Sequence, residues 1–228
     1  MAICEYGGPD VFDWIDIDIG DPGPGQVRIK HEAIGLNFRD TYHRSGAYQI
    51  PDVTFPAIIG SDGSGVIEAV GAGAGKFSVG DRVVYCSGPM GSYCQARLML
   101  AAHVLKLQEG IAFKTASAMM VKGLTARYLL RDSYVVGPID TILIQAAAGG
   151  VGLIMIQWAK LLGATVIGTV STEEKAALAQ RYGCDHVINY QTESFPERVR
   201  KITDGRGVDV VYDGRRARVL SEEWINKN

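Results

Sequence analysis

The stretch Thr141-Ile-Leu-Ile-Gln-Ala-Ala-Ala-Gly149-Gly150-Val151-Gly152-Leu-Ile-Met-Ile-Gln-Trp158-Ala-Lys160 decides the fold of the second half of the chain. Its first residues, 141–144, are β-branched or aliphatic, which is typical of a buried strand in a parallel sheet. A glycine turn follows, and apolar residues then recur at helical spacing: Val151, Ile154, Met155, Trp158 and Leu162. The sequence therefore predicts a strand, a glycine turn and a helix.

The turn itself contains Ala147-x-Gly149-x-x-Gly152, the dinucleotide-binding fingerprint with alanine in place of the first glycine. In this arrangement free backbone N–H groups and a helix N-terminus lie beneath a pyrophosphate. We expect Gly149 to let the backbone approach a phosphate and Gly152 to let the helix pack closely on the strand. The alternative is a plain strand-to-helix turn of another α/β protein, because a glycine motif alone is weak.

The composition indicates a globular protein of one or two domains, with 228 residues, 47% hydrophobic and 21% charged. The formal net charge of −2 offers no basic field for nucleic acid or an anionic membrane. No apolar run reaches membrane-spanning length, and the N-terminus lacks a signal-peptide pattern. We therefore expect a cytoplasmic protein that binds neither nucleic acid nor membrane.

The cysteines do not form a recognisable site. There are four (Cys4, Cys86, Cys94 and Cys184), without C-x-x-C spacing and without a histidine at zinc-ligand intervals. Free thiols in a reducing compartment are the expected state. A catalytic cysteine remains an alternative that no motif supports.

The first ~110 residues predict an all-β, barrel-like module rather than a βαβ unit. Short strand-like runs at 26–31, 65–70 and 81–86 are separated by glycine- and proline-rich turns at 21–25, 71–75 and 87–89.

The rest of the chain predicts alternating helices and strands, which indicates a parallel sheet with right-handed crossovers. A helix is expected at 115–130, with Ala116, Met119, Met120 and Leu124 on one side. After the segment that opens this section come strands at 165–170, 185–189 and 208–212 and helices at 172–182 and 195–203.

The end of the strand at 165–170 favours NADPH over NADH. An NAD site places Asp or Glu there to hold the ribose 2′-hydroxyl. This chain instead has Ser171, with Lys175 nearby, and a hydroxyl with a lysine suits a 2′-phosphate. Glu173 and Glu174 would oppose this choice, but at a helix start they are expected to face solvent.

Two segments of the first half contain concentrated polar side chains. Residues 33–48 hold an amide, two phenols, an acid and three bases after an apolar lead-in, and a solvated helical turn is the alternative to a site. Residues 60–65, Gly-Ser-Asp-Gly-Ser-Gly, indicate tight backbone packing beside a strand more than catalysis.

These motifs, in this order, resemble the zinc-independent quinone oxidoreductases, the ζ-crystallin-like branch of the medium-chain dehydrogenase/reductase superfamily. The resemblance runs through about residues 5–214. It rests on residues 33–48, Gly80-Asp-Arg-Val-Val-Tyr85, Val121-Lys-Gly-Leu-Thr125, residues 145–152, Val187-Ile-Asn-Tyr190 and Val210-Val-Tyr-Asp213.

The resemblance implies a GroES-like β-barrel domain (1–112), which binds substrate, and a Rossmann domain for NADPH (113–214), with cofactor and substrate in the cleft between them. By matching position, Asn37 and Tyr48 would lie in the substrate pocket. The cofactor residues would be Phe38, Tyr42, Thr125 and Tyr128 at the nicotinamide, Gly149, Gly150, Val151 and Gly152 at the pyrophosphate, and Ser171, Lys175 and Tyr190 at the 2′-phosphate and adenosine.

The same comparison implies a reaction without metal. Zinc-dependent relatives carry Cys where this chain has Asn37 and Gly-His-Glu where it has Gly60-Ser61-Asp62, and an amide and a hydroxyl do not replace those ligands. The expected chemistry is hydride transfer from NADPH to a quinone or enone. Tyr42 and Tyr48 are the candidate catalytic residues, as proton donors or as positional groups.

The family pattern stops near Gly214, and residues 215–228 form an atypical tail. Four strands are expected, whereas the dinucleotide fold has six. We therefore expect a C-terminally truncated member, or a short variant whose tail forms a capping helix at 220–226. Relatives are usually homodimers, and the strand through which they pair is expected to be missing. The alternative function is an impaired member that binds nucleotide weakly or not at all.

Overall fold

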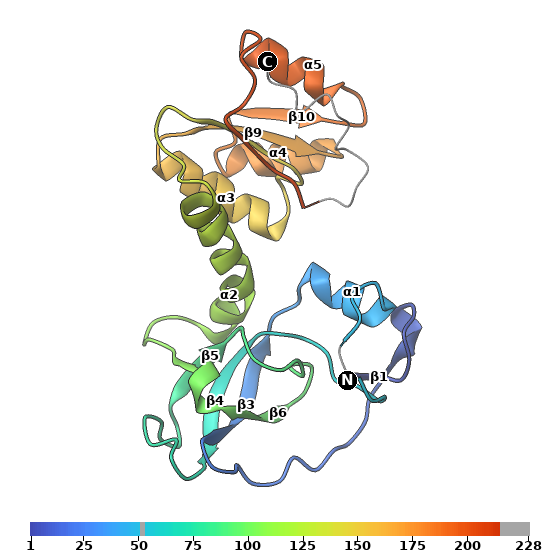
Figure 1. Ribbon diagram of the computed structural model, residues 1–228, viewed down its shortest axis with the longest axis vertical. Coiled ribbons are helices and arrows are strands. Elements are labelled where there is room, and N and C mark those ends of the chain that lie inside the picture. The colour runs from blue at the N-terminus through green and yellow to red at the C-terminus, as the bar shows by residue number, and fades with distance from the viewer. Residues whose placement is uncertain (51–52, 215–228) are drawn as a thin grey trace. The chain divides into compact units, whose positions relative to one another are not determined.

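The computed structural model describes residues 1–50 and 53–214 (Figure 1). The chain forms two compact units, of which the first ends at Val121 and the second begins at Lys122. We describe each unit by itself. The capping helix expected at 220–226 lies outside the described residues.

The first unit is built on an antiparallel sheet of five strands in the order β6-β3-β4-β5-β7. The strands are β3 (Gln26–Ile34), β4 (Gly63–Val70), β5 (Arg82–Tyr85), β6 (Ala96–Leu100) and β7 (Leu105–Lys106). Alternate residues of β3, Val27 and Ile29, are buried in its core beside Ile67 and Val83. The predicted β sheet of this half is confirmed, but the half is not all-β, because it also contains the helix at Phe38–Ser45.

Short elements surround this sheet. Strands β1 (Ala2–Ile3) and β2 (Phe12–Asp13) pair with each other, and two 3-10 turns lie at η1 (Pro9–Val11) and η2 (Ala101–His103). Helix α1 (Phe38–Ser45) ends at Gly46, whose φ of 75° is a left-handed conformation that glycine adopts readily.

Helix α2 (Phe113–Tyr128) continues directly into a π-helix, η3 (Leu129–Ser133). Its first half is fixed to the barrel sheet, because the Ser117 and Ser64 hydroxyls lie 2.8 Å apart and Ser117 donates to the Ala33 carbonyl at 2.9 Å. The helix predicted at 115–130 is confirmed, and the apolar residues on its predicted side differ in burial. Ala116 is buried, whereas Met119 and Leu124 are 44% and 49% exposed.

The second unit is a parallel sheet of four strands in the order β10-β9-β8-β11. Its strands are β8 (Thr141–Ile144), β9 (Thr165–Val170), β10 (His186–Asn189) and β11 (Val210–Tyr212), connected by helices α3 (Gly150–Leu161), α4 (Glu173–Arg181) and α5 (Phe195–Ile202). Every strand and helix predicted in this region is present.

Helices cover both faces of this sheet (Figure 1). Ile142 and Ile144 of β8 pack into one core with residues of α3 and α4, including Met155 and Ala179. The residue between them, Leu143, packs on the opposite face with α5. This alternation explains why Ile142, Leu143 and Ile144 are all apolar, since both faces of β8 are buried.

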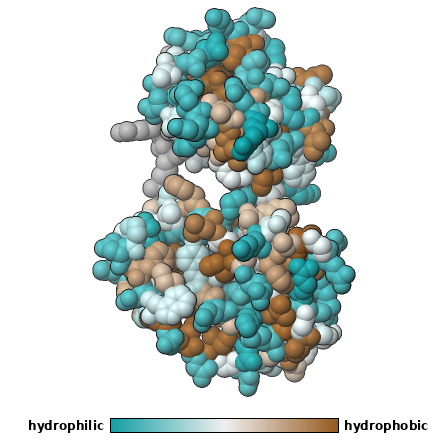
Figure 2. Space-filling model, turned by 180° about the vertical axis from the view of Figure 1, so that it is seen from behind, coloured by the Kyte–Doolittle hydropathy of each residue, from teal (hydrophilic) through white to brown (hydrophobic). Residues whose placement is uncertain are grey.

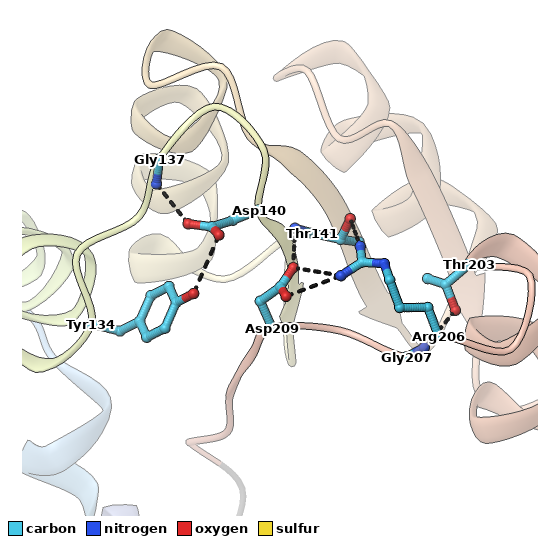
Figure 3. Close-up of polar contacts among 8 residues, drawn as sticks. All are labelled: Tyr134, Gly137, Asp140, Thr141, Thr203, Arg206, Gly207 and Asp209. Atoms are coloured by element: carbon cyan, nitrogen blue, oxygen red, sulfur yellow. Dashed lines mark hydrogen bonds and ion pairs between the residues drawn. The ribbon is translucent and has the colours of Figure 1, made fainter. Parts of the chain in front are cut away.

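Polar contacts fix the edge strand β11 to β8 where the two strands begin (Figure 3). The Thr141 amide donates to the Asp209 carboxylate at 2.8 Å, and the Asp209 amide donates to the Thr141 carbonyl at 2.8 Å. Arg206 contacts the Asp209 carboxylate at 3.0 Å and the Thr141 hydroxyl at 2.8 Å. At the other end of β11, the buried Tyr212 hydroxyl donates to the Leu129 carbonyl at 3.1 Å, and burial raises the pKa of Tyr212 to about 12.

On the face that Figure 2 shows, hydrophobic side chains lie in several separate groups among hydrophilic ones. Scattered apolar residues of this kind are ordinary on a folded surface. Within the part of the chain that the structure describes, no helix is long and apolar enough to cross a membrane.

At Gly152, helix α3 packs closely against the turn that follows β8. A Cβ atom at this position would lie 2.5 Å from the Ala147 carbonyl oxygen and 2.7 Å from that of Ala146. This contact confirms the packing role predicted for Gly152, and both obstacles are backbone atoms that cannot turn aside.

We predict that Gly152→Ala lowers the free energy of unfolding by about 2 kcal/mol, because α3 must move away from the strand. The matched control is Gly137→Ala, since a Cβ there would meet only an Asp140 oxygen at 3.8 Å. The control is expected to be neutral or stabilising by up to ~1 kcal/mol. Urea denaturation followed by circular dichroism measures both. Equal stability of the two variants would contradict the close packing.

Candidate functional site

The loop between β8 and α3 presents an open helix N-terminus. Gly149 is the N-cap of α3, and its amide is already used in a hydrogen bond to the Ala146 carbonyl at 2.8 Å. The Leu153 amide donates to the Gly149 carbonyl at 2.9 Å, which begins the helical hydrogen-bonding series. The first-turn amides of Gly150, Val151 and Gly152 therefore have no partner within the helix, as at any helix start. Together with the helix dipole they suit an anion.

The second feature of the site is where this loop lies relative to the strand order of the sheet. The chain runs outward from β8 through β9 to β10 and then returns to place β11 on the other side of β8. The strand order reverses between β8 and β11, and ligands of open α/β sheets bind beyond the carboxyl ends of the strands at such a point. The order β10-β9-β8-β11 corresponds to the first four strands of the dinucleotide fold, 3-2-1-4.

A pocket of about 150 Å³ lies beyond the carboxyl ends of β8 and β9. Its lining combines the loop before α3 with the end of β9 and the residues that follow it: Ala146, Ala148, Gly149, Thr169, Val170, Ser171, Lys175 and Tyr190. Four of the predicted cofactor residues, Gly149, Ser171, Lys175 and Tyr190, thus line one pocket. Sequence reasoning did not identify Thr169, whose buried hydroxyl donates to the Gln145 side chain beneath the pocket.

Among the described residues that line this pocket, Lys175 is the charged one. The Lys175 ammonium lies 3.1 Å from the Ser171 hydroxyl oxygen. The two neighbouring acids are engaged elsewhere: Glu173 accepts a hydrogen bond from the Asn189 amide at 2.9 Å, and hydrogen bonding to Thr172, the N-cap of α4, lowers the pKa of Glu174. The rim therefore offers a hydroxyl and an ammonium to an anion.

The pocket and its surroundings fit part of NADPH. Its volume of about 150 Å³ suits part of a dinucleotide rather than the whole molecule, since pockets for drug-sized ligands are larger. The open amides at α3 fit a diphosphate, and the Ser171–Lys175 pair fits a 2′-phosphate, whereas no carboxylate lines the pocket to hold a free 2′-hydroxyl. The second unit therefore has groups suited to the phosphorylated half of NADPH.

The predicted residues of the first unit form a separate aromatic cluster around α1. The Tyr42 and Tyr48 ring centroids lie 5.0 Å apart, and the Phe38 ring meets Tyr42 edge-on at 5.3 Å. Phe38 is 75% exposed and Tyr48 is 49% exposed. Thr125 and Tyr128, the other residues predicted at the nicotinamide, lie on α2 in the second unit, where Tyr128 is exposed.

Asn37, the predicted substrate residue, is held by two buried carboxylates. Its side-chain amide donates to Asp62 at 2.6 Å, and its backbone amide donates to Asp40 at 2.9 Å within the capping box of α1. Tyr93 donates to the same Asp40 at 3.0 Å, and burial raises the pKa of this phenol. Asp62 thus contacts the residue predicted to face the substrate, which the sequence alone did not indicate.

The structure rejects the alternative that residues 33–48 form only a solvated turn. Asp40 and His43 are buried, with 2% and 8% exposure. The tight packing predicted at 60–65 is confirmed: a Cβ on Gly60 would overlap Ser92, and one on Gly65 would overlap the Lys30 carbonyl. Among residues 1–50 and 53–214 no three His, Cys, Asp or Glu side chains are placed to hold a metal ion.

A second pocket of about 150 Å³ lies in the first unit, beside Trp14, Ile17 and Cys94. It contains none of the predicted site residues. Its lining is mainly aliphatic and includes no lysine or arginine, so it does not suit a dinucleotide phosphate.

Two protein-family models match the chain. The model for the alcohol dehydrogenase GroES-like domain covers residues 23–141, more than half of the chain, and the model for zinc-binding dehydrogenases covers residues 150–221.

Individual relatives and a solved structure are also similar to this chain. The chain is 51% identical to a 2-haloacrylate reductase of a Burkholderia species and 49% identical to a quinone oxidoreductase of Pseudomonas aeruginosa, in each case over 93% of this chain and 65% of the relative. The crystal structure of Escherichia coli quinone oxidoreductase complexed with NADPH is similar with a TM-score of 0.90 and 42% identity, over 94% of this chain and 66% of that one.

The chain thus spans about 65% of the length of these curated relatives. Within that span both the sequence and the fold of the chain are similar to those of the relatives. The chain belongs to the zinc-independent quinone oxidoreductase family of the medium-chain dehydrogenase/reductase superfamily.

Proposed function

We propose that this protein is an NADPH-dependent reductase that transfers hydride to a quinone or to a similar electron-poor carbonyl acceptor. The observation that carries the proposal is the pocket at the carboxyl ends of β8 and β9, where Ser171 and Lys175 lie together beside the open start of α3. The E. coli relative is described in complex with NADPH, which supports the same cofactor here.

The names of the relatives support a class of acceptor. A quinone and a 2-haloacrylate both contain a carbon–carbon double bond conjugated to a carbonyl group, and the relatives are named for reducing one or the other. Such a system accepts hydride and delocalises the resulting negative charge onto oxygen. We therefore propose a flat, conjugated acceptor rather than an isolated ketone or aldehyde.

Some residues of this chain would bind the cofactor, and others would orient the acceptor. NADPH, when bound, supplies the hydride. Ser171 and Lys175 would hold its 2′-phosphate, with Tyr190 beside the adenosine, while Thr125 and Tyr128 would contact the nicotinamide. Asn37, oriented by Asp62, would hydrogen-bond the acceptor. Hydride addition to a quinone leaves a hydroquinone anion, which takes one proton from a phenol or from water.

The direct test is the oxidation of NADPH by the purified chain, measured by absorbance with and without a water-soluble quinone. We expect oxidation that requires the quinone, and a 2-haloacrylate is the second acceptor to compare. Cofactor binding without oxidation in the presence of either acceptor would contradict the proposed reaction, while leaving the cofactor assignment intact.

The choice of NADPH is tested at Lys175. We predict that Lys175→Met weakens NADPH binding by roughly ten-fold or more and leaves NADH binding unchanged, because only NADPH carries the 2′-phosphate. Fluorescence titration measures both dissociation constants. The control is Lys201→Met, which removes an exposed lysine of α5 outside the pocket. Tighter binding of NADH than NADPH by the unsubstituted chain would overturn the assignment.

The phenols are tested by Tyr42→Phe and Tyr48→Phe. We predict that each lowers kcat by less than about ten-fold, because water can protonate a hydroquinone anion, whereas removal of an obligatory proton donor costs roughly 100-fold or more. Tyr182→Phe, at the end of α4 in the other unit, is the control. A loss of 100-fold in either variant would identify that tyrosine as the proton donor.

A further inference from the structure

The start of α3 lacks a charge of its own. The loop and first turn, Gln145-Ala-Ala-Ala-Gly-Gly-Val-Gly152, contain no ionisable side chain. The only charged residue of α3, Lys160, lies in its last turn and is paired with Asp185 at 2.8 Å. A helix N-terminus carries about half a positive charge, whereas a dinucleotide diphosphate carries two negative charges. A full cation beside this turn would therefore strengthen binding of the diphosphate.

Lys122 of α2 brings such a cation to the turn. A Cβ atom built on Gly150 would lie 2.8 Å from Lys122 Cδ and 2.9 Å from its Cε. The aliphatic part of this lysine therefore crosses the backbone of Gly150, the first residue of α3. The ammonium is one bond beyond Cε, so it lies at the same end of the helix as the open amides.

The contact with Lys122 explains why position 150 is a glycine. Gly150 is not among the residues with a positive φ, so its backbone conformation does not require glycine. The three nearest atoms that a Cβ would meet, at 2.8, 2.9 and 3.8 Å, all belong to Lys122. Alanine at this position would push the lysine stem away. Gly150 thus provides the space in which Lys122 reaches the helix start.

Lys122 and Lys175 reach different parts of the same site. Lys175 lies in the first turn of α4, 3.1 Å from Ser171 and next to the position proposed for the 2′-phosphate. Lys122 lies against the first residue of α3, next to the position proposed for the diphosphate. The two cations therefore act on phosphates that can be separated chemically, because NADH has the diphosphate without the 2′-phosphate.

We propose that Lys122 is a cofactor-binding residue whose ammonium pairs with the diphosphate of the nicotinamide dinucleotide, across Gly150. This inference rests on the proposed function. It assigns to Lys122 the affinity that NADPH and NADH share, and it leaves to Lys175 the preference between them. A lysine in this role acts as a point charge, so its contribution decreases as salt concentration rises.

The test is a comparison of Lys122→Met with Lys175→Met in the full chain. Methionine keeps most of the stem that packs on Gly150 and removes the charge, so loss of packing alone has little effect. We expect Lys122→Met to weaken NADPH and NADH by the same factor, about ten-fold or 1.4 kcal/mol. Lys175→Met weakens NADPH alone. Lys122→Arg, which keeps the charge, is expected to restore most of the affinity.

Cofactor fragments locate the effect without the nicotinamide. ADP contains the diphosphate and no 2′-phosphate, whereas adenosine 2′-monophosphate contains the 2′-phosphate and no diphosphate. Lys122→Met is expected to weaken ADP and spare adenosine 2′-monophosphate, and Lys175→Met is expected to show the reverse. Lys114→Met, an exposed position near the start of the same helix, is the control and changes neither.

The outcomes separate this inference from the proposed function. If the unsubstituted chain binds NADPH and Lys122→Met binds NADPH, NADH and ADP equally well, Lys122 only packs on Gly150 and the inference fails alone. A loss confined to NADPH would also overturn it, because the lysine would then act at the 2′-phosphate. If the unsubstituted chain binds neither NADPH nor NADH, the proposed function fails together with the inference.

Discussion

The approach of α3 to the end of β8 is the constraint on which the second unit depends. Gly152 has no side chain, so the helix starts directly against the carbonyls of Ala146 and Ala147. This contact aims the open amides of the first turn past the carboxyl end of β8, where the strand order reverses. The same placement lets Met155 and Ala159 pack on Ile142 and Ile144, so one close contact supports both the core and the proposed phosphate site.

The two units carry different functional groups, lysines near the proposed phosphate site in the second and aromatic rings in the first. The turn before α3 is uncharged, so cations for phosphate must come from other elements, and the structure places one lysine of α2 and one of α4 beside it. The first unit carries the aromatic rings of Phe38, Tyr42 and Tyr48, which suit a flat conjugated acceptor. Hydrogen bonds to the buried carboxylates of Asp40 and Asp62 fix Asn37 in the same unit.

The sequence predicted the second unit well because its signals are local. Strands β8 and β9 begin and end at the predicted residues, since both are short runs rich in β-branched and aliphatic residues with turns at each end. The exposure of Met119 and Leu124 on α2 could not be predicted, because apolar spacing does not show which neighbour covers a helix. The contacts of Lys122 with Gly150 and of Asp62 with Asn37 join segments far apart in the chain, so no local pattern reports them. The pocket residue Thr169 was missed for the same reason.

The central claim is that the open amides at the start of α3 bind the dinucleotide diphosphate. Backbone amide resonances of the isotope-labelled chain, recorded during titration with NADPH, test it most directly. We predict that the amides of Gly150, Val151 and Gly152 shift together with those of Ser171 and Lys175, at a single dissociation constant, and that ADP shifts only the first group. Saturable NADPH binding that leaves the resonances of Gly150, Val151 and Gly152 unchanged would contradict the account.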